Sequence, residues 1–337
     1  MATLLVPEVH ADINTAVAAA SDGDTISIAD GTYTEYIANT KQLIYTGRTL
    51  DPTGVVITNG AYAYTMVLGN GSVVANVTVN YTGGVGGHRY AIGAQGPHTA
   101  VLVISNVHIN TNASGIGRLG FGSTIDRCKI VCTYKNTGYP TYGIYQTATG
   151  SGTPTSVGST LVLDFNHAQI YAEPITVVNS VTHTSYVRNT SIRGIYATHH
   201  FNNIAVLDGP NGFSGIGVAN GGSSSNCLAF GWTGSSYGDY TFGSGSTNTN
   251  NLRSADVTAS GKPVFVDIAN DDFRVDPTGI AYHSGTYAFQ STYNTFLNDL
   301  VGTPFDNPPS RGAYEHVASS GGTSTDVRCR LGLKLGI

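Results

Sequence analysis

The feature that most limits how this chain can fold is a long series of short apolar segments separated by glycine and small polar residues. From about Gln42 to Val257 the helical period of 3.6 residues does not return. Glycine accounts for 43 of the 337 residues, whereas charged residues make up only 11 %, well below the roughly 25 % of an ordinary globular domain. Because surface helices usually carry many Glu and Lys side chains, the sequence predicts an all-β protein.

Several of these segments contain an asparagine followed by alternating aliphatic residues. Val74–Val79 and Val103–Ile109 are examples. The series comprises Asn76, Asn106, Asn166, Asn189 and Asn226, with steps of 30, 60, 23 and 37 residues. Such steps are typical of a solenoid whose coils contain on the order of 20–30 residues and carry inserted loops.

A solenoid of this kind is a coil of short parallel strands, each paired with strands of the coils before and after it. Asparagine suits the corners, because it tolerates a left-handed backbone and its amide can hydrogen-bond to an asparagine one coil away. A β-sandwich or barrel with ordinary hairpins is the alternative. It is disfavoured because few Asn-Gly or Asp-Gly turns join neighbouring apolar segments.

One clear helix is predicted, close to the amino terminus. Apolar side chains recur with helical spacing at Ile13, Ala16, Val17 and Ala20. Asp12 is a suitable N-cap, and the alternating segment Thr25–Ala29 that follows predicts a strand. Because the open end of a solenoid exposes core residues and unpaired edge groups, we expect this helix to cover the first coil.

The segment from Ile13 to Glu35 resembles the opening of right-handed parallel β-helix proteins of the pectin-lyase-like superfamily, in which a helix precedes G-D-T-I and G-x-Y-x-E. Near the other end, Asp271–Pro277 and Arg311–Glu315 are similar to the elements that cap and close many of these proteins. The resemblance implies a right-handed parallel β-helix solenoid with an N-terminal capping helix and a C-terminal tail strand. The expected divisions are a cap at 1–36, the β-helix with its closing segment at 37–316, a flexible linker at 317–325 and a docking strand at 326–337.

The superfamily includes polysaccharide lyases and glycoside hydrolases, so enzymatic residues must be considered. Hydrolysis needs paired carboxyl groups, and a lyase needs a base close to a metal or cation that neutralises the substrate carboxylate. Acidic residues are scarce in the predicted coil, and no two are adjacent between Leu68 and Asp256. The best enzymatic cluster is Asp126, Arg127, Lys129, His167, Glu173, Arg188 and Arg193.

In a lyase, Arg127, His167 and Arg188 would share one outer face and hold a uronate carboxylate. His167 or Lys129 would then act as the base, and Glu173 as a metal ligand. A long solenoid also carries scattered charges on its exterior that have no catalytic role. We therefore assign no catalytic residue, no metal ligand and no cofactor from the sequence.

Tyrosines, histidines and cysteines add weaker indications. The 20 tyrosines and Trp232 could form a surface on which sugars stack, although core stacking explains them equally well. The adjacent His199 and His200 would point to opposite faces of a strand, so a turn pair is favoured over a metal site.

Cys128 and Cys132 lack a second ligand pair for zinc and are expected to be buried free thiols. Four stretches rich in Gly, Ser and Thr are predicted to be loops, at 83–96, 147–160, 209–225 and 231–248.

The last residues form the most regular pattern in the chain. Ser319–Thr325 has the composition of a flexible linker, and residues 327–337 then alternate strictly between apolar side chains and basic or glycine residues. The predicted docking strand comprises Val327, Arg328, Cys329, Arg330, Leu331, Leu333, Lys334, Leu335 and Ile337. Because its apolar face needs a partner, we expect the strand to add to another subunit or protein. Capping of its own solenoid is the alternative.

Charge and hydropathy exclude two classes of partner. The net charge is −5 and the body of the chain has no basic stripe, which argues against a nucleic acid bound through its phosphates. No apolar run approaches the roughly 20 residues of a membrane-spanning helix. Residues Met1–Glu8 lack the pattern of a secretory signal, so synthesis in a cytoplasm without export by that route is expected.

A glycine-rich β-helix of low charge with a tethered strand resembles the accessory proteins of phage particles. This resemblance implies a structural virion protein, such as a capsid decoration, spike or fibre component, that assembles in the host cytoplasm and is then located on the virion. Its expected partners are other virion subunits bound through the C-terminal strand, copies of itself in a homo-oligomer such as a trimer, and host surface glycans. The alternative function is a polysaccharide lyase or glycoside hydrolase acting on an acidic polysaccharide.

Overall fold

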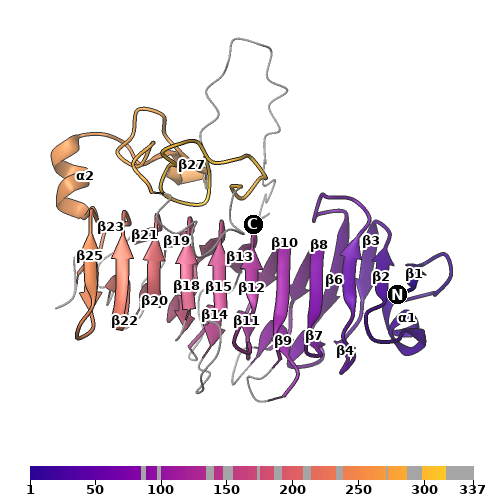
Figure 1. Cartoon of the computed structure of the whole chain (residues 1–337). Coiled ribbons are helices and arrows are strands. Elements are labelled where there is room, and N and C mark those ends of the chain that lie inside the picture. The colour runs from indigo at the N-terminus through magenta and orange to yellow at the C-terminus, as the bar shows by residue number, and fades with distance from the viewer. Residues whose placement is uncertain are drawn as a thin grey trace, which may run out of the picture.

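The computed structural model is an elongated coil of short strands wound around one axis (Figure 1). The structure describes residues 1–84, 89–96, 100–133, 140–146, 155–172, 175–185, 192–207, 214–232, 238–270, 272–286 and 298–315. The described strand pairs of the coil are all parallel, and only the short pair β26–β27 outside it is antiparallel. The prediction of a right-handed parallel β-helix is confirmed, and the sandwich with hairpins is wrong.

The strands form three parallel stacks, which we call A, B and C. Stack A contains β1 (Thr3–Val6), β2 (Thr25–Ile28), β5 (Ile44–Gly47), β12 (Thr124–Asp126), β15 (Thr155–Gly158), β18 (Ile175–Val178) and β25 (Thr247–Thr249). Stack B contains β3 (Gly31–Thr34), β6 (Val55–Asn59), β13 (Lys129–Cys132), β16 (Leu161–Leu163), β19 (Val181–Thr184), β21 (Ile204–Leu207) and β23 (Leu228–Phe230). Stack C contains β4 (Ile37–Ala38), β7 (Tyr64–Leu68), β9 (Tyr90–Ala94), β11 (Ser114–Gly117), β14 (Tyr142–Gln146), β17 (Ala168–Ala172) and β24 (Tyr240–Phe242).

Four longer strands turn a corner and take part in two stacks. β8 (Ser72–Tyr81) and β10 (Leu102–Thr111) begin in stack A and end in stack B. β20 (Arg193–Phe201) and β22 (Ser214–Ser225) begin in stack C and end in stack A. These strands carry the chain around a corner without a break in pairing.

The predicted amino-terminal helix is confirmed as α1 (Ile13–Ala19), whose buried side chains are Ile13, Ala16 and Val17. Asp12 caps it, and its carboxylate accepts a hydrogen bond from the Thr15 N–H at 2.7 Å. The Glu35 carboxylate accepts a second bond from the Ile13 N–H at 3.0 Å. The spacing of G-x-Y-x-E therefore has a physical role here, because it brings the Glu35 carboxylate to the positive end of the helix.

The inward side chains of stack C form a column of isoleucines. Consecutive coils place Ile92, Ile116, Ile144, Ile170, Ile195 and Ile216 in register, and each of them is fully buried. In the sequence five of the six lie between small or aromatic residues, as in Gly-Ile-Gly or Gly-Ile-Tyr, and Ile170 follows a glutamine. The steps between them are 24, 28, 26, 25 and 21 residues. This repeat gives the coil length directly, and the asparagine series used for the prediction is less regular.

The inward column of stack A changes from mostly apolar to polar side chains along the axis. It runs through Leu4, Ile26, Tyr45, Val74, Ile104, Ile125, Val157, Val177, His200, Ser224 and Asn248. The last three positions are polar, so the final coils are held more by hydrogen bonds than by apolar contact. The Asn251 amide, for example, donates to Ser224 Oγ at 2.8 Å.

The corner between stacks A and B uses a left-handed residue in every coil from Asn76 onward. The positive φ angles belong to Asn76, Asn106, Arg127, Ser159, Asn179, Asn202, Asn226 and Asn250. The predicted amide ladder is present in part: Asn106 donates to Asn76 at 2.8 Å, and Asn202 donates to Asn179 at 2.9 Å. The placement of Asn166 in this series is wrong, since it accepts from the Thr141 N–H instead. Asn189 lies outside the described residues.

The carboxyl-terminal closing segment differs from the expectation that it caps the end of the coil. It contains α2 (Ser254–Ser260), β26 (Phe265–Asp267) and β27 (Asp272–Val275), and it lies beside the row of strands rather than beyond β25 (Figure 1). Its apolar side chains, among them Val264, Phe273 and Leu300, pack on the outer side of stack B. The helix α2 was not predicted, because it is short and buries none of its residues.

The closing segment stays there because outward residues of stack B become apolar at that point. One register row reads His108, Lys129, Leu161, Val181, Ile204 and Leu228 along the axis. The described part of the segment packs on the apolar part of this row, from Leu161 onward. Polar contacts fix it as well, since Ser159 donates to the Asn298 carbonyl and Arg311 to the Cys227 carbonyl, both at 2.7 Å.

Parts of the predicted loops are strands. β9, β15 and β22 fall within the stretches 83–96, 147–160 and 209–225, β24 falls within 231–248, and β25 begins there. Glycine and serine are compatible with β9, β15 and β22 because these strands pair on both sides and a neighbouring ring covers several of the glycines. In the part of the chain that the structure describes, no helix is long and apolar enough to cross a membrane.

Removal of one isoleucine from the stack C column tests the importance of these contacts. Ile144→Ala is expected to lower the free energy of unfolding by about 2–5 kcal/mol, because it leaves a cavity between Ile116 and Ile170. Chemical denaturation measures the change. Val103→Ala removes an aliphatic side chain that is 36 % exposed and is expected to cost under about 1 kcal/mol. Equal losses in both variants would contradict the prediction.

Candidate functional site

The outer side of stack C carries a row of half-buried tyrosines. Tyr145, Tyr171 and Tyr196 occupy the same register position on β14, β17 and β20. Their rings are stacked, with centroids 6.0 Å apart for the first pair and 5.1 Å apart for the second. Tyr142 lies beside them, 4.4 Å from the ring of Tyr145. Because parallel strands are spaced by about 4.8 Å, one ring per coil makes a continuous aromatic surface along the axis.

Glycine at the next coil lets the last ring of the row lie close to the backbone. A Cβ atom at Gly217 would be 2.6 Å from the Tyr196 ring. The same arrangement occurs earlier in stack C, where Gly93 lies under Tyr64 and Gly117 under Tyr90. A side chain at any of these glycines would displace the neighbouring tyrosine.

Arg193 is held against this row. Its guanidinium carbon is 5.4 Å from the ring centre of Tyr171 and 4.9 Å from that of Tyr196, within the range of cation–π attraction. His167 contacts the edge of the Tyr142 ring at 5.0 Å between centroids. Burial lowers the pKa of His167, and the charge of Arg193 lowers it further, so the imidazole is neutral near pH 7. Arg193 is therefore the fixed positive charge of the surface.

We call Tyr142, Tyr145, Tyr171, Tyr196, His167 and Arg193 the tyrosine surface. The hydroxyls of Tyr142, Tyr145 and Tyr171 make no hydrogen bond to other described residues. Burial raises the pKa of Tyr142 to about 12, which keeps its hydroxyl protonated. An apolar body with hydroxyl groups and one arginine is suited to sugar rings and to a carboxylate.

The structure separates the charged cluster that the sequence analysis placed together. Arg127 lies at the corner between stacks A and B, whereas His167 lies at the corner between stacks B and C. The prediction that these two share one outer face with Arg188 is therefore wrong, because successive corners of a three-sided coil face different directions. Glu173 and Arg188 lie outside the described residues. Only His167 and Arg193 of the cluster belong to the tyrosine surface.

The corner between stacks A and B holds the rest of the cluster. Arg127 Nε contacts the Asp126 carboxylate at 2.9 Å, and Arg127 Nη2 donates to Ser105 Oγ at 3.1 Å. Burial raises the pKa of Asp126, although the Arg127 hydrogen bond opposes this shift. Lys129 follows on β13, in register with His108 of β10. This corner offers one buried carboxylate and not the pair that hydrolysis needs.

The histidine and cysteine predictions are partly confirmed. His200 is fully buried and His199 is half-buried, so they do point to opposite faces, but both belong to β20 and not to a turn. Cys128, Cys132 and Cys227 are buried free thiols, as predicted for the first two.

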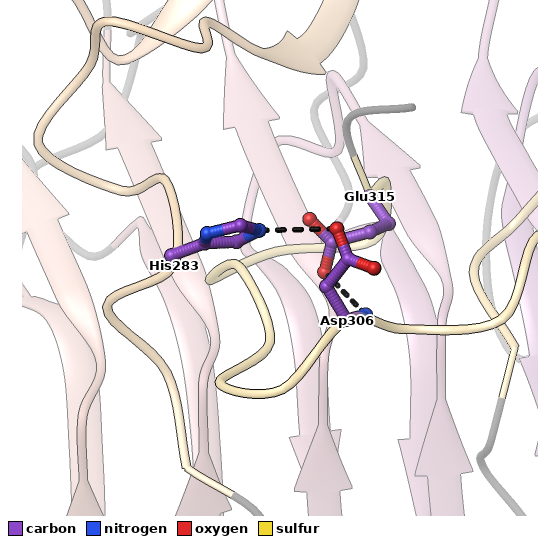
Figure 2. Close-up of side chains that lie close together, drawn as sticks. All are labelled: His283, Asp306 and Glu315. Carbon is purple, nitrogen blue, oxygen red and sulfur yellow. Dashed lines mark hydrogen bonds and ion pairs between the residues drawn. The ribbon is translucent and has the colours of Figure 1, made fainter. Parts of the chain in front are cut away.

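A group of possible metal ligands that the sequence analysis missed lies in the closing segment. His283, Asp306 and Glu315 point toward one another (Figure 2), with one ligand atom of each within 4.8 Å of the others. His283 Nε2 is 3.1 Å from Asp306 Oδ2. These residues are far apart in the sequence, so no local spacing indicates a metal site. Glu315 belongs to the Arg311–Glu315 element, which the sequence predicts to be a structural closing element.

Comparison with known proteins supports the fold. A crystal structure of pectate lyase Pel9A superimposes with a TM-score of 0.53 and 14 % identity, over 94 % of this chain and 97 % of that chain. Pectin methylesterases are more distant: the Aspergillus niger enzyme gives a TM-score of 0.41 at 14 % identity, covering 75 % of this chain and 87 % of that one. The Yersinia enterocolitica enzyme gives 0.38 at 11 % identity, covering 72 % and 90 %. No protein-family profile and no curated protein matches the sequence.

The pectate lyase shares the parallel β-helix fold with this chain. At this level of identity the likeness concerns the fold alone. The predicted docking strand at 326–337, including Val327, Leu331 and Ile337, lies outside the described residues, as does the linker at 317–325.

The half-buried His108 on the outer side of stack B predicts a pH dependence. Burial, with a smaller effect of Lys129, lowers the pKa of His108 to about 4. In the unfolded chain a histidine titrates near pH 6.5, so between these values the unfolded state binds more protons and stability is lost as the pH falls from about 6.5 towards 4. His108→Gln is expected to reduce this loss by up to ~1.4 kcal/mol per pH unit, measured by denaturation over that range.

Part of the pH dependence will remain in this variant, because burial also lowers the pKa of His200 to about 4. Asn110→Ser changes a neighbouring outward side chain of β10 that does not titrate, so it should leave the slope of stability against pH as it is. If the slope of stability against pH is the same in His108→Gln as in the unaltered chain, the pKa of His108 is not lowered by folding.

Proposed function

We propose that this protein binds an acidic polysaccharide along the tyrosine surface and does not cleave it. The observation that carries the proposal is the register of Tyr145, Tyr171 and Tyr196 on successive coils, with Arg193 held over two of the rings. A linear polymer lying along the axis would meet equivalent groups at each coil. The fold is also that of proteins whose names refer to pectate and pectin, which are polymers of this class.

The preference for an acidic ligand rests on Arg193. Its guanidinium is planar and always charged, and it can pair with a carboxylate through two parallel hydrogen bonds. Contact with Tyr171 and Tyr196 orients it before a ligand arrives, which reduces the entropy lost on binding. The tyrosine hydroxyls would hydrogen-bond to sugar hydroxyls.

A polysaccharide lyase is the second candidate function, favoured by the pairing of Asp126 with Arg127 close to Lys129. In that case Arg127 would neutralise the uronate carboxylate and Lys129 would act as the base. The candidate is weakened because His167, the other base of the predicted site, lies at a different corner from Arg127 and Lys129. Binding without cleavage needs only the tyrosine surface.

We place this binding activity in a virion structural protein, held to other virion subunits by the strand at 326–337. The support is the sequence pattern of that strand and the low charge of the chain. Location on the virion, assembly into a homo-oligomer such as a trimer and contact with host surface glycans belong to the same proposal.

The binding proposal predicts losses in specific variants. Tyr171→Ala and Arg193→Gln are each expected to weaken binding of polygalacturonate about tenfold or more, because each removes a principal contact. Isothermal titration calorimetry measures the dissociation constant, with a neutral glucan as the comparison ligand. Tyr171→Phe separates the hydroxyl from the ring, and Arg193→Lys separates the planar guanidinium from the charge.

Tyr62→Ala and Arg274→Gln are matched controls, since Tyr62 is 56 % exposed and Arg274 lies in the closing segment. Neither should change binding. Equal binding by all variants would remove the tyrosine surface from the proposal. Ultraviolet absorbance from unsaturated uronate products, abolished in Lys129→Met, would establish the lyase instead.

Deletion of residues 326–337 tests attachment to the virion. The shortened chain is expected to remain folded, with an unchanged thermal melting curve, because its apolar strand serves a partner and not its own core. It should fail to co-sediment with particles that the full chain joins. A shortened chain that unfolds would favour self-capping, and one that still co-sediments would exclude the strand as the anchor.

A further inference from the structure

We infer that His283, Asp306 and Glu315 form a divalent metal site that fixes the closing segment at the point where the tail begins. The three side chains come from separate parts of the segment, yet one ligand atom of each lies within 4.8 Å of the other two (Figure 2). Nothing in the proposed polysaccharide binding requires this group, since it lies on the segment that covers stack B.

The donor set is appropriate for a transition metal. One imidazole nitrogen and two carboxylates are ligands that Zn²⁺ and Mn²⁺ accept, with water in the remaining positions. Ca²⁺ prefers 6–8 oxygen ligands and would be held less well by a site that includes a nitrogen. We therefore assign the site to a metal of the zinc or manganese type.

The geometry needs only small movements to bind an ion. Tetrahedral ligands about 2.0–2.1 Å from a metal lie about 3.3 Å from one another, so the widest separation here must close by about 1.5 Å. His283 and Asp306 can make this movement, because their side chains are 36 % and 55 % exposed. Their present contact, with Nε2 and Oδ2 3.1 Å apart, is already at that distance.

Glu315 is the fixed member of the group. It is buried, and its Oε2 accepts hydrogen bonds from the Ser310 N–H at 2.8 Å and the Asp306 N–H at 3.4 Å. Ser310 Oγ donates to the other carboxylate oxygen. Donors of this kind orient a metal ligand.

The surroundings favour an added positive charge. The Asp299 carboxylate accepts from the Glu315 N–H at 3.1 Å. A cation between His283, Asp306 and Glu315 would offset the negative charge of these neighbouring carboxylates and join the loop of residues 281–286 to that of residues 298–315.

Metal titration of the untagged full chain tests the inference. After dialysis against a chelator, calorimetry with Zn²⁺ or Mn²⁺ should give one site per chain, bound more tightly than Ca²⁺. Co²⁺ should give a visible absorption band that Zn²⁺ removes. His283→Gln and Asp306→Asn are each expected to weaken binding about tenfold or more.

Two control variants complete the test. His10→Gln and Asp267→Asn change a histidine and an exposed carboxylate outside the group and should bind the metal like the unaltered chain. Both ligand variants change partly exposed side chains, so each is expected to fold like the unaltered chain. Circular dichroism checks this expectation. Absence of saturable binding, or full binding in both ligand variants, would overturn the inference.

Discussion

The structure depends on parallel pairing between strands of successive coils. Each coil must present its backbone groups in register with the coils on either side, so inward positions repeat at the same place in every turn. Stack C meets this requirement with one isoleucine per coil, whose branched side chains fill equivalent positions. The corner between stacks A and B meets it with one left-handed residue per coil, which is asparagine in six of the eight coils that have one there.

The outer sides of the three stacks are free of this constraint, and they differ for that reason. Apolar outward residues on the later part of stack B hold the closing segment, whereas the earlier outward residues His108 and Lys129 are polar. Stack C carries tyrosines and glycines, which leave an aromatic surface with one well-placed arginine. Scaffold and recognition surface are thus built from alternate residues of the same strands.

The metal group and the tyrosine surface are separate features with separate origins. The tyrosine surface follows from the coil, because register alone aligns Tyr145, Tyr171 and Tyr196. The metal group follows from the way the closing segment folds on stack B, which brings His283 and Glu315 together across 32 residues of sequence. An ion there would fix Glu315, the last described residue before the predicted linker and docking strand.

The sequence by itself determined the coil, the capping helix and the buried thiols, because these depend on local spacing: a cap at Asp12, alternation within strands and asparagine at corners. It also named His167 and Arg193 of the tyrosine surface, but it gave the tyrosines only as a class and did not group these residues. Arg127 and His167 were placed on one face, and only the tertiary structure assigned them to different corners, since loops of unequal length between Asn106 and Asn226 hide the register from the sequence. The position of the closing segment and the convergence of His283, Asp306 and Glu315 were likewise decided by packing on the outer side of stack B, a contact between residues distant in the chain that no local pattern records.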